Sequence, residues 1–213
     1  MSNDKITVLL VDDHTVVRDG VRLMLGTARD IVVAGEADTA HDAMHIIREQ
    51  AFDVALVDIA LPDRNGLELL KQFRAEQPKL AVLILSMYSE EVYALRAIKY
   101  GAVGYLTKNC SATTVVAAVR KAAAGGRHVS PALAEKLANM LSGSNIPLHE
   151  ELSNREIEVL RFLVAGAGLL KIADSMHIST STVATYRARI LQKMGMTSNV
   201  ELARYALESG LLL

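Results

Sequence analysis

Five polar residues of this chain stand where short apolar runs end, and this placement constrains the fold more than any other feature. They are Asp12, Asp13, Asp58, Ser86 and Lys108. The runs are separated by helix-length amphipathic stretches, a pattern typical of strands buried on both faces of a parallel sheet. Because ligands of open α/β sheets bind outside the carboxyl ends of the strands, the five side chains are predicted to converge on one pocket.

Bringing three carboxylates, a hydroxyl and an ammonium group together in one pocket destabilises the fold unless the pocket binds ligands. Like charges at short distance raise each other's pKa unless a metal ion or a lysine compensates them. Taken singly, Asp13 would be explained as a helix N-cap and Lys108 as a solvated loop charge. The whole set would then need several independent coincidences, so the pattern favours a site for a cation and an anion.

The alternation of strand and helix patterns predicts an α/β domain. The expected fold is doubly wound and flavodoxin-like, with a five-stranded parallel sheet in the order 2-1-3-4-5. The strands are expected at 5–11, 31–35, 53–57, 81–86 and 103–107. The helices are expected at 14–26, 39–50, 65–76, 89–99 and 111–124.

The chain after residue 150 shows a different pattern, which is wholly helical. Ser153 and Glu156 have the spacing of a capping box that opens an apolar helix. A short helix, a turn and a longer helix follow at 169–176, 177–179 and 181–194. This is the plan of a helix-turn-helix, whose second helix enters the major groove of DNA. A plain four-helix oligomerisation bundle is the alternative.

Composition narrows the class of protein further. With 213 residues, of which 51% are hydrophobic, the chain is long enough for two small packed domains. The net charge of −1 excludes a protein that binds its partners through an overall excess of positive charge. The stretch between Asp174 and Glu201 nevertheless carries only basic charges. The histidines show no metal-ligand spacing and are interpreted as non-ligands. The single cysteine and the absence of a long apolar segment predict a cytoplasmic protein without a membrane partner.

The sequence motifs around the five polar residues resemble those of the receiver domain of bacterial two-component response regulators. They are VDDH at 11–14, DIALPDRNG at 58–66 and GAVGYLTK at 101–108. The resemblance covers residues 5 to about 126. It implies that Asp58 is the phosphoacceptor, which takes a phosphoryl group from a histidine kinase.

The same resemblance implies a role for each other residue of the pocket. Mg2+ is the implied cofactor, and its expected ligands are Asp12, Asp13, Asp58 and the carbonyl of Ala60. Ser86 and Lys108 are expected to bind the phosphoryl oxygens. Tyr105 is expected to act as a switch residue that fills space vacated by Ser86.

A second set of sequence motifs resembles the LuxR-type DNA-binding domain. They are LSNREIEVL at 152–160, KIA at 171–173, ISTSTV at 178–183 and KMG at 193–195. A receiver followed by that domain is the arrangement of the NarL/FixJ family of transcriptional regulators. The resemblance implies a receiver domain at 1–126, a linker at 127–149 and a helix-turn-helix domain at 150–213. The linker is expected to be structured in its first half and flexible in its second.

The longer helix of the helix-turn-helix is expected to contact DNA. Val183, Thr185 and Tyr186 are small or flat enough to approach base edges. Arg187, Arg189 and Lys193 are expected to reach phosphates or guanine. The DNA-binding form is predicted to be a homodimer in which the final helix, near Ala203 to Ser209, pairs with its mate.

The sequence thus predicts a phosphorylation-controlled transcriptional regulator rather than an enzyme. Its expected partners are a sensor histidine kinase, promoter DNA and a second copy of the chain, with RNA polymerase as a further candidate. One alternative uses the receiver only as a phosphorylation-independent dimerisation module. Another, a phosphatase of the haloacid dehalogenase type, requires Asp-x-Asp on the first strand, and Asp12-Asp13-His14 breaks that pattern.

Overall fold

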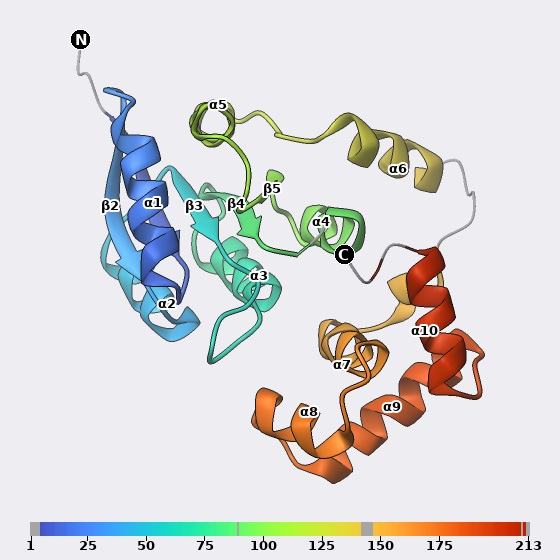
Figure 1. Cartoon of the computed structure of the whole chain (residues 1–213). Helices are drawn as coiled ribbons and strands as arrows, with labels where there is room; N and C mark the ends of the chain where they lie inside the picture. Colours follow the sequence, from blue (N-terminus) through green and yellow to red (C-terminus); the bar gives the residue numbers. More distant parts are fainter. Residues whose placement is uncertain (1–4, 89, 142–146, 210, 212–213) are drawn as a thin grey trace. The chain divides into compact units, whose positions relative to one another are not determined.

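The computed structural model of the chain describes residues 5–88, 90–141, 147–209 and 211 (Figure 1). The chain divides into two compact units, Met1–Lys136 and Leu137–Leu213. The division falls within helix α6 (Pro131–Leu141), inside the predicted linker. The half of that linker predicted to be flexible includes residues 142–146, which lie outside the described residues. None of the helices in the described part of the chain has both the length and the apolar character that a membrane crossing requires.

The first unit contains the predicted five-stranded parallel sheet, in the order β2-β1-β3-β4-β5. Its strands are β1 (Ile6–Val11), β2 (Ile31–Ala37), β3 (Val54–Val57), β4 (Ala81–Ser86) and β5 (Gly104–Thr107). All of β3, and all of β4 except its first residue, is buried, as expected for strands covered on both faces. The doubly wound fold is confirmed.

Strand β2 extends to Ala37, beyond the predicted end at residue 35. The apolar run stops before Glu36, but the backbone continues to pair with β1, where Leu10 lies opposite Glu36 and Val11 lies opposite Ala37. Main-chain hydrogen bonding, which the hydrophobic pattern does not report, therefore sets the end of this strand.

Helices cover both faces of the sheet. They are α1 (Thr15–Gly26), α2 (Ala40–Glu49), α3 (Gly66–Glu76), α4 (Glu90–Lys99) and α5 (Ala112–Ala123). Helix α1 packs against α5 on one face, whereas α3 packs between α2 and α4 on the other (Figure 1). The side chains of Thr39, Asn65 and Ser111 accept hydrogen bonds from the first turns of α2, α3 and α5 and so fix where these helices begin.

The second unit contains the predicted helices. They are α7 (Asn154–Val164), α8 (Leu169–Met176), α9 (Thr180–Met194) and α10 (Asn199–Glu208). A 3-10 helix that the sequence does not predict, η1 (Leu148–Glu151), precedes them. The capping box is present: Ser153 Oγ accepts from the N–H of Glu156, and the Glu156 carboxylate accepts from the N–H of Ser153. His177, with a φ of 53°, ends α8 in the left-handed conformation before the chain enters α9. The helix-turn-helix is confirmed.

Helix α10 begins at Asn199, earlier than the predicted start near Ala203. Ser198 is its N-cap, since the side chain accepts a hydrogen bond from the N–H of Glu201. The longer helix includes Val200 and Leu207, which are 78% and 74% exposed. Because these two residues are seven positions apart, they lie on the same face of α10.

Candidate functional site

The carboxyl ends of the strands bring the predicted pocket residues to one edge of the sheet. Asp12 directly follows β1, and Asp58 directly follows β3. Ser86 is the last residue of β4, and Lys108 directly follows β5. The N–H of Asp58 donates to the carbonyl of Val11 at 2.8 Å, which holds the two acidic strand ends in register.

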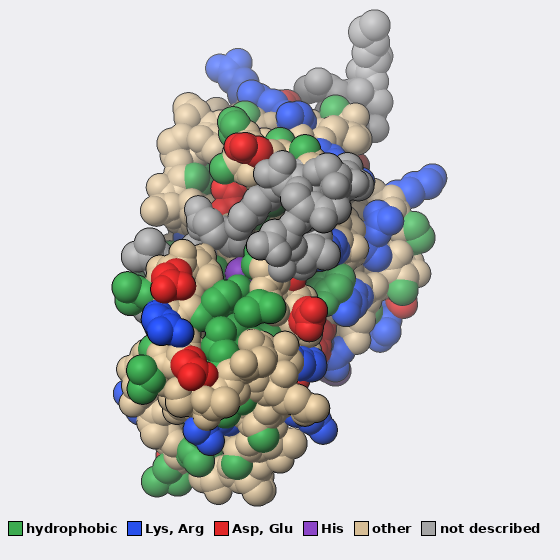
Figure 2. Space-filling model, turned by 90° about the vertical axis from the view of Figure 1, so that its right-hand side faces the viewer, with side chains coloured by type: hydrophobic (Ala, Val, Ile, Leu, Met, Phe, Trp, Pro, Cys, Tyr) green, Lys and Arg blue, Asp and Glu red, His purple; other side chains and the backbone are tan. Residues whose placement is uncertain are grey.

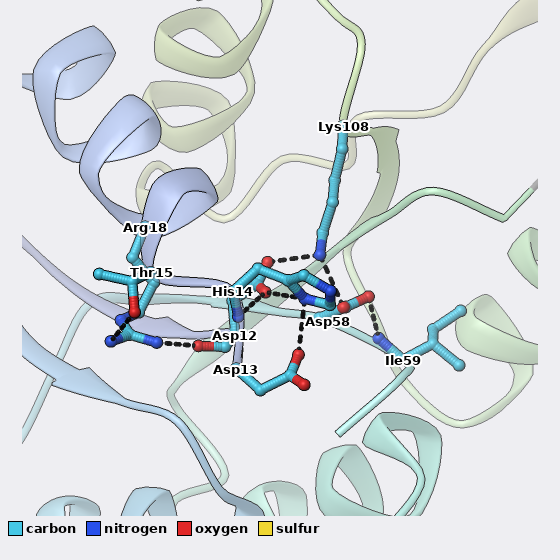
Figure 3. A network of polar contacts seen from close by, with 8 residues as sticks. All are labelled: Asp12, Asp13, His14, Thr15, Arg18, Asp58, Ile59 and Lys108. Carbon is cyan, nitrogen blue, oxygen red and sulfur yellow. Dashed lines mark hydrogen bonds and ion pairs between the residues drawn. The ribbon is translucent and has the colours of Figure 1, made fainter. Parts of the chain in front are cut away.

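Lys108 links the two buried aspartates (Figure 3). Its Nζ lies 2.6 Å from Asp12 Oδ2 and 2.7 Å from Asp58 Oδ2, and the side chains of Lys108 and Asp58 are each only 3% exposed. Burial by itself lowers the pKa of Lys108, but hydrogen bonds to the two carboxylates and their charges outweigh burial, so the pKa is raised above its ordinary value. The lysine is therefore a fixed positive charge within the pocket.

Asp13 and His14 complete the cluster where the chain enters α1. His14 Nδ1 lies 2.7 Å from Asp13 Oδ1 and 3.2 Å from Asp12 Oδ1. Asp12, Asp13, His14 and Asp58 each offer one ligand atom, and these atoms all lie within 4.8 Å of one another. The sequence predicts the three carboxylates here but not His14, whose position directly after the acidic pair is the only signal that could have found it.

Arg18 also supports the pocket, and the sequence does not predict it. Its Nη1 donates to the backbone carbonyl of Asp12, and its Nε lies 3.6 Å from Glu36 Oε2 on β2. The guanidinium thus ties the end of β1 to the edge strand of the sheet. Nothing in the sequence separates Arg18 from Arg22 of the same helix, because the contact depends on how the chain bends between β1 and α1.

The loop after β3 folds back over Asp58. The N–H of Ile59 donates to Asp58 Oδ1 at 2.7 Å, Ala60 forms an isolated bridge with Asn65, and the N–H of Gly66 donates to the carbonyl of Ile59 at 2.8 Å. A Cβ atom at Gly66 would lie 1.9 Å from the backbone oxygen of Asp58, far inside van der Waals contact. Only glycine lets the loop close this tightly.

We expect Gly66→Ala to force this loop open and to destabilise the first unit by about 1–3 kcal/mol, the usual cost of overpacking. Thermal unfolding of the full chain measures the effect. Gly20→Ala on α1 is the matched control, because no atom lies within 4 Å of a Cβ at that position. Alanine in a helix stabilises by about 0.5–1 kcal/mol relative to glycine. An unchanged melting temperature for Gly66→Ala would contradict the close approach.

Ser86 and Tyr105 are both buried and both contact Tyr88. Ser86 Oγ accepts from the N–H of Tyr88 at 3.3 Å, and the hydroxyl of Tyr105 donates to the carbonyl of Tyr88 at 2.8 Å. The ring of Tyr88 stacks on Tyr93 of α4, with centroids 5.0 Å apart. The ring of Tyr105 is already buried in this structure, and its predicted switch role on phosphorylation stays a prediction.

Helix α9 presents only some of the residues predicted to contact DNA. Thr185 and Arg189 are exposed, and Tyr186 and Arg187 are partly exposed. Val183 is 0% exposed, so the prediction that it approaches base edges is wrong. It lies seven positions before Ile190, which is also buried, and the two share the inward face of the helix.

Lys193 and Arg187 have partners within the second unit. Lys193 Nζ lies 2.6 Å from Glu156 Oε2 and therefore fastens the end of α9 to the start of α7. Burial raises the pKa of Glu156, but hydrogen bonds from Lys193 and Ser153 outweigh it and lower that pKa. Arg187 Nε donates to Asn199 Oδ1 at 2.7 Å. The side chain of Lys193 is nevertheless 39% exposed, so its contact with DNA stays a prediction.

The chain has no overall excess of positive charge. On the face that Figure 2 shows, Lys and Arg side chains occur together with Asp and Glu side chains, in keeping with the net charge of −1. A contact of α9 with an anion therefore depends on local cations. Arg189 and Lys193 are both exposed on this helix, and Lys193 also pairs with Glu156.

Two stretches of the chain match known families. Residues 8–120 match the response regulator receiver domain, and residues 150–206 match the bacterial regulatory proteins of the luxR family. Response regulator GacA of Pseudomonas aeruginosa is 36% identical over 211 residues, which cover 97% of this chain and 98% of that protein.

Further relatives extend over nearly the whole chain as well. Transcriptional regulatory protein UhpA of Escherichia coli is 37% identical over 200 residues, or 93% of this chain and 96% of that protein. Among solved structures, response regulator ChrA of a heme-sensing two-component system has a TM-score of 0.54 and 33% identity, covering 97% of this chain and 98% of that one.

Proposed function

This chain belongs to the NarL/FixJ family of two-component response regulators, which are transcriptional regulators controlled by phosphorylation, and we propose that Asp58 is its phosphoacceptor. The observation that supports this residue most directly is its burial against Lys108. A carboxylate that is 3% exposed and ion-paired at 2.7 Å, at the carboxyl end of a central strand, lies where open α/β sheets bind ligands.

The pocket answers the main difficulty of phosphoryl transfer to a carboxylate, which is that both groups are negative. A carboxylate oxygen of Asp58 forms a bond to phosphorus, the P–N bond of a phosphohistidine breaks, and the nitrogen keeps the electron pair. Charge on the transferring group spreads over its oxygens. Lys108, whose raised pKa keeps it protonated, is in place to meet those oxygens, and the hydroxyl of Ser86 would donate to another.

We also propose that Mg2+ is the cofactor. Three carboxylates and one ammonium leave two formal negative charges uncompensated, which matches a divalent cation. Mg2+ prefers carboxylates, backbone carbonyls and retained waters. Asp13, Asp58 and the carbonyl of Ala60 would ligate it directly, and Asp12 through water. When bound, the ion supplies positive charge that stabilises the transferring phosphoryl oxygens.

Phosphorylation would reach helix α4 through Tyr88. A phosphoryl group adds about −1.5 to −2 charges at the end of β3. The Ser86 hydroxyl would then turn from the N–H of Tyr88 toward the new oxygens. Because Tyr88 also accepts a hydrogen bond from Tyr105 and stacks on Tyr93, its release changes the packing of α4.

The proposed partners follow from the family and from two exposed faces of the second unit. The donor is a sensor histidine kinase, and the DNA is a promoter bound through α9 in the cytoplasm. A second copy of the chain is proposed to pair through α10, where Val200 and Leu207 expose an apolar face. RNA polymerase is a further proposed partner of the DNA-bound dimer.

The test of this function compares the full chain with and without a small phosphodonor and Mg2+. We expect phosphorylation to shift the chain from monomer toward dimer in sedimentation velocity. It should also tighten binding to DNA fragments selected in vitro from a random pool. If both properties are the same in the two states, the receiver is a phosphorylation-independent dimerisation module and the proposal fails.

Arg189 is the residue of α9 that we propose for a phosphate contact. Arg189→Ala is expected to weaken binding to all sequences alike and to reduce the slope of log K against log salt concentration by about one. If Arg187 instead forms hydrogen bonds to a guanine, replacing it with alanine should reduce the binding free energy by about 1–3 kcal/mol and relax the base preference at that one position. Arg29→Ala removes the same charge from an exposed site of the first unit and should leave the slope unchanged. Equal slopes for wild type and Arg189→Ala would refute the contact.

A further inference from the structure

The imidazole of His14 has no part in the function proposed above, although its position is well defined. The N–H of His14 donates to Asp12 Oδ1 at 2.9 Å, and its carbonyl accepts from the N–H of Val17 at 3.0 Å at the start of α1. The side chain makes no capping hydrogen bond to this helix. The backbone thus fixes His14 at the mouth of the pocket, and its ring lies against the carboxylates of Asp12 and Asp13 rather than on the helix.

The ring lies beside the carboxylate oxygens that Lys108 leaves open (Figure 3). Lys108 Nζ contacts the Oδ2 atoms of Asp12 and Asp58, whereas His14 Nδ1 lies beside the Oδ1 atoms of Asp12 and Asp13. The nitrogen of His14 therefore lies beside carboxylate oxygens other than the two that the lysine ammonium contacts. The side chain of His14 is 61% exposed, so the ring can adjust without disturbing the core.

A neutral imidazole adds a nitrogen ligand without changing the charge of the pocket. Mg2+ is a hard ion that binds oxygen ligands and gains little from nitrogen. Ni2+ and Zn2+ bind imidazole well, and they generally bind sites with both nitrogen and oxygen ligands more tightly than Mg2+ does. We infer that His14 is a ligand for transition-metal ions, so that this pocket binds Ni2+ or Zn2+ through His14 and the carboxylates in addition to Mg2+. The inference rests on the proposed function, since it concerns the same cation site.

The inference is tested by isothermal titration calorimetry of the untagged full chain with Ni2+ and, separately, with Mg2+. His14→Phe keeps a ring of similar size but removes both nitrogens. We expect it to weaken Ni2+ binding by at least about tenfold, because loss of even an outer-shell partner of a metal ligand typically costs 10- to 100-fold in affinity. Mg2+ affinity should stay within about twofold, since oxygen ligands hold that ion.

His45→Phe is the matched control. The side chain of His45 is 68% exposed, and its Nδ1 lies 3.5 Å from Glu49 Oε1, so it is another histidine beside a carboxylate, but outside the cluster. This variant should bind Ni2+ as tightly as the wild type.

Equally tight Ni2+ binding by wild type and His14→Phe would overturn the inference. An equal loss for both metals would do so as well, because it would mean that His14 shapes the loop rather than donates a nitrogen. Failure of Asp58 to accept phosphate in the presence of Mg2+ defeats the proposed function instead. In that case the Ni2+ affinities of the wild type and His14→Phe still decide whether the nitrogen is a ligand.

Discussion

The chain carrying Asp58→Asn is expected to gain no phosphate when it is incubated with a small phosphodonor and Mg2+, whereas the wild type gains one phosphate mass. The amide has nearly the same shape as the carboxylate but lacks the anionic oxygen that attacks phosphorus. Intact-mass spectrometry measures the increment directly. Removal of the divalent cation with a chelator should also abolish the increment in the wild type, because the repulsion between carboxylate and phosphoryl oxygens is then uncompensated.

Asp53→Asn is the control, because Asp53 and Asp58 flank the same strand, β3. Asp53 Oδ2 accepts hydrogen bonds from the N–H and the hydroxyl of Thr7, each at 2.8 Å, at the amino end of the sheet. This variant should be labelled as fully as the wild type. A phosphate increment in Asp58→Asn that equals that of the wild type would show that another residue is the acceptor.

Replacing Val183 with glutamate is expected to unfold the second unit. Val183 is 0% exposed, so the new carboxylate would be buried without a partner. An uncompensated buried charge costs about 3–5 kcal/mol. That is a large share of the stability of a small domain, which is about 5–15 kcal/mol. Circular dichroism and limited proteolysis of the full chain should report loss of the helical unit while the sheet of the first unit persists.

Thr185→Glu separates unfolding from lost DNA contact. Thr185 lies on the same helix but is exposed, so glutamate there should leave the fold intact. It should nevertheless abolish DNA binding, because a negative charge is placed against the phosphate backbone. If the second unit of the Val183→Glu variant melts at the same temperature as that of the wild type, the burial of Val183 is contradicted.

Local patterns in the sequence predict the sheet, the helices and the acidic pocket because these features depend on short-range order. Asp12, Asp58 and Lys108 each follow a strand, and parallel strands align their carboxyl ends. The capping box at Ser153 is likewise visible within four residues. Position relative to an element is therefore enough to place most of the pocket.

Contacts between distant segments cannot be predicted in this way. The pairs Lys193 with Glu156 and Arg187 with Asn199 join residues 37 and 12 positions apart, and both depend on how the helices pack. The error at Val183 has another origin. Its small side chain suits a DNA groove, but the spacing to Ile190 places it inward, and helical periodicity outweighs size.

Lys108 contacts other pocket residues through both its side chain and its main chain. Its ammonium holds Asp58, while its backbone N–H donates to the carbonyl of Ser86 at 2.9 Å. The same residue therefore contacts both the proposed phosphoacceptor and the last residue of β4. If Asp58 accepts a phosphoryl group as proposed and the ammonium moves toward it, the main chain of Lys108 would carry the last residue of β4 with it through this hydrogen bond. This main-chain connection would act beside the proposed route through Tyr88.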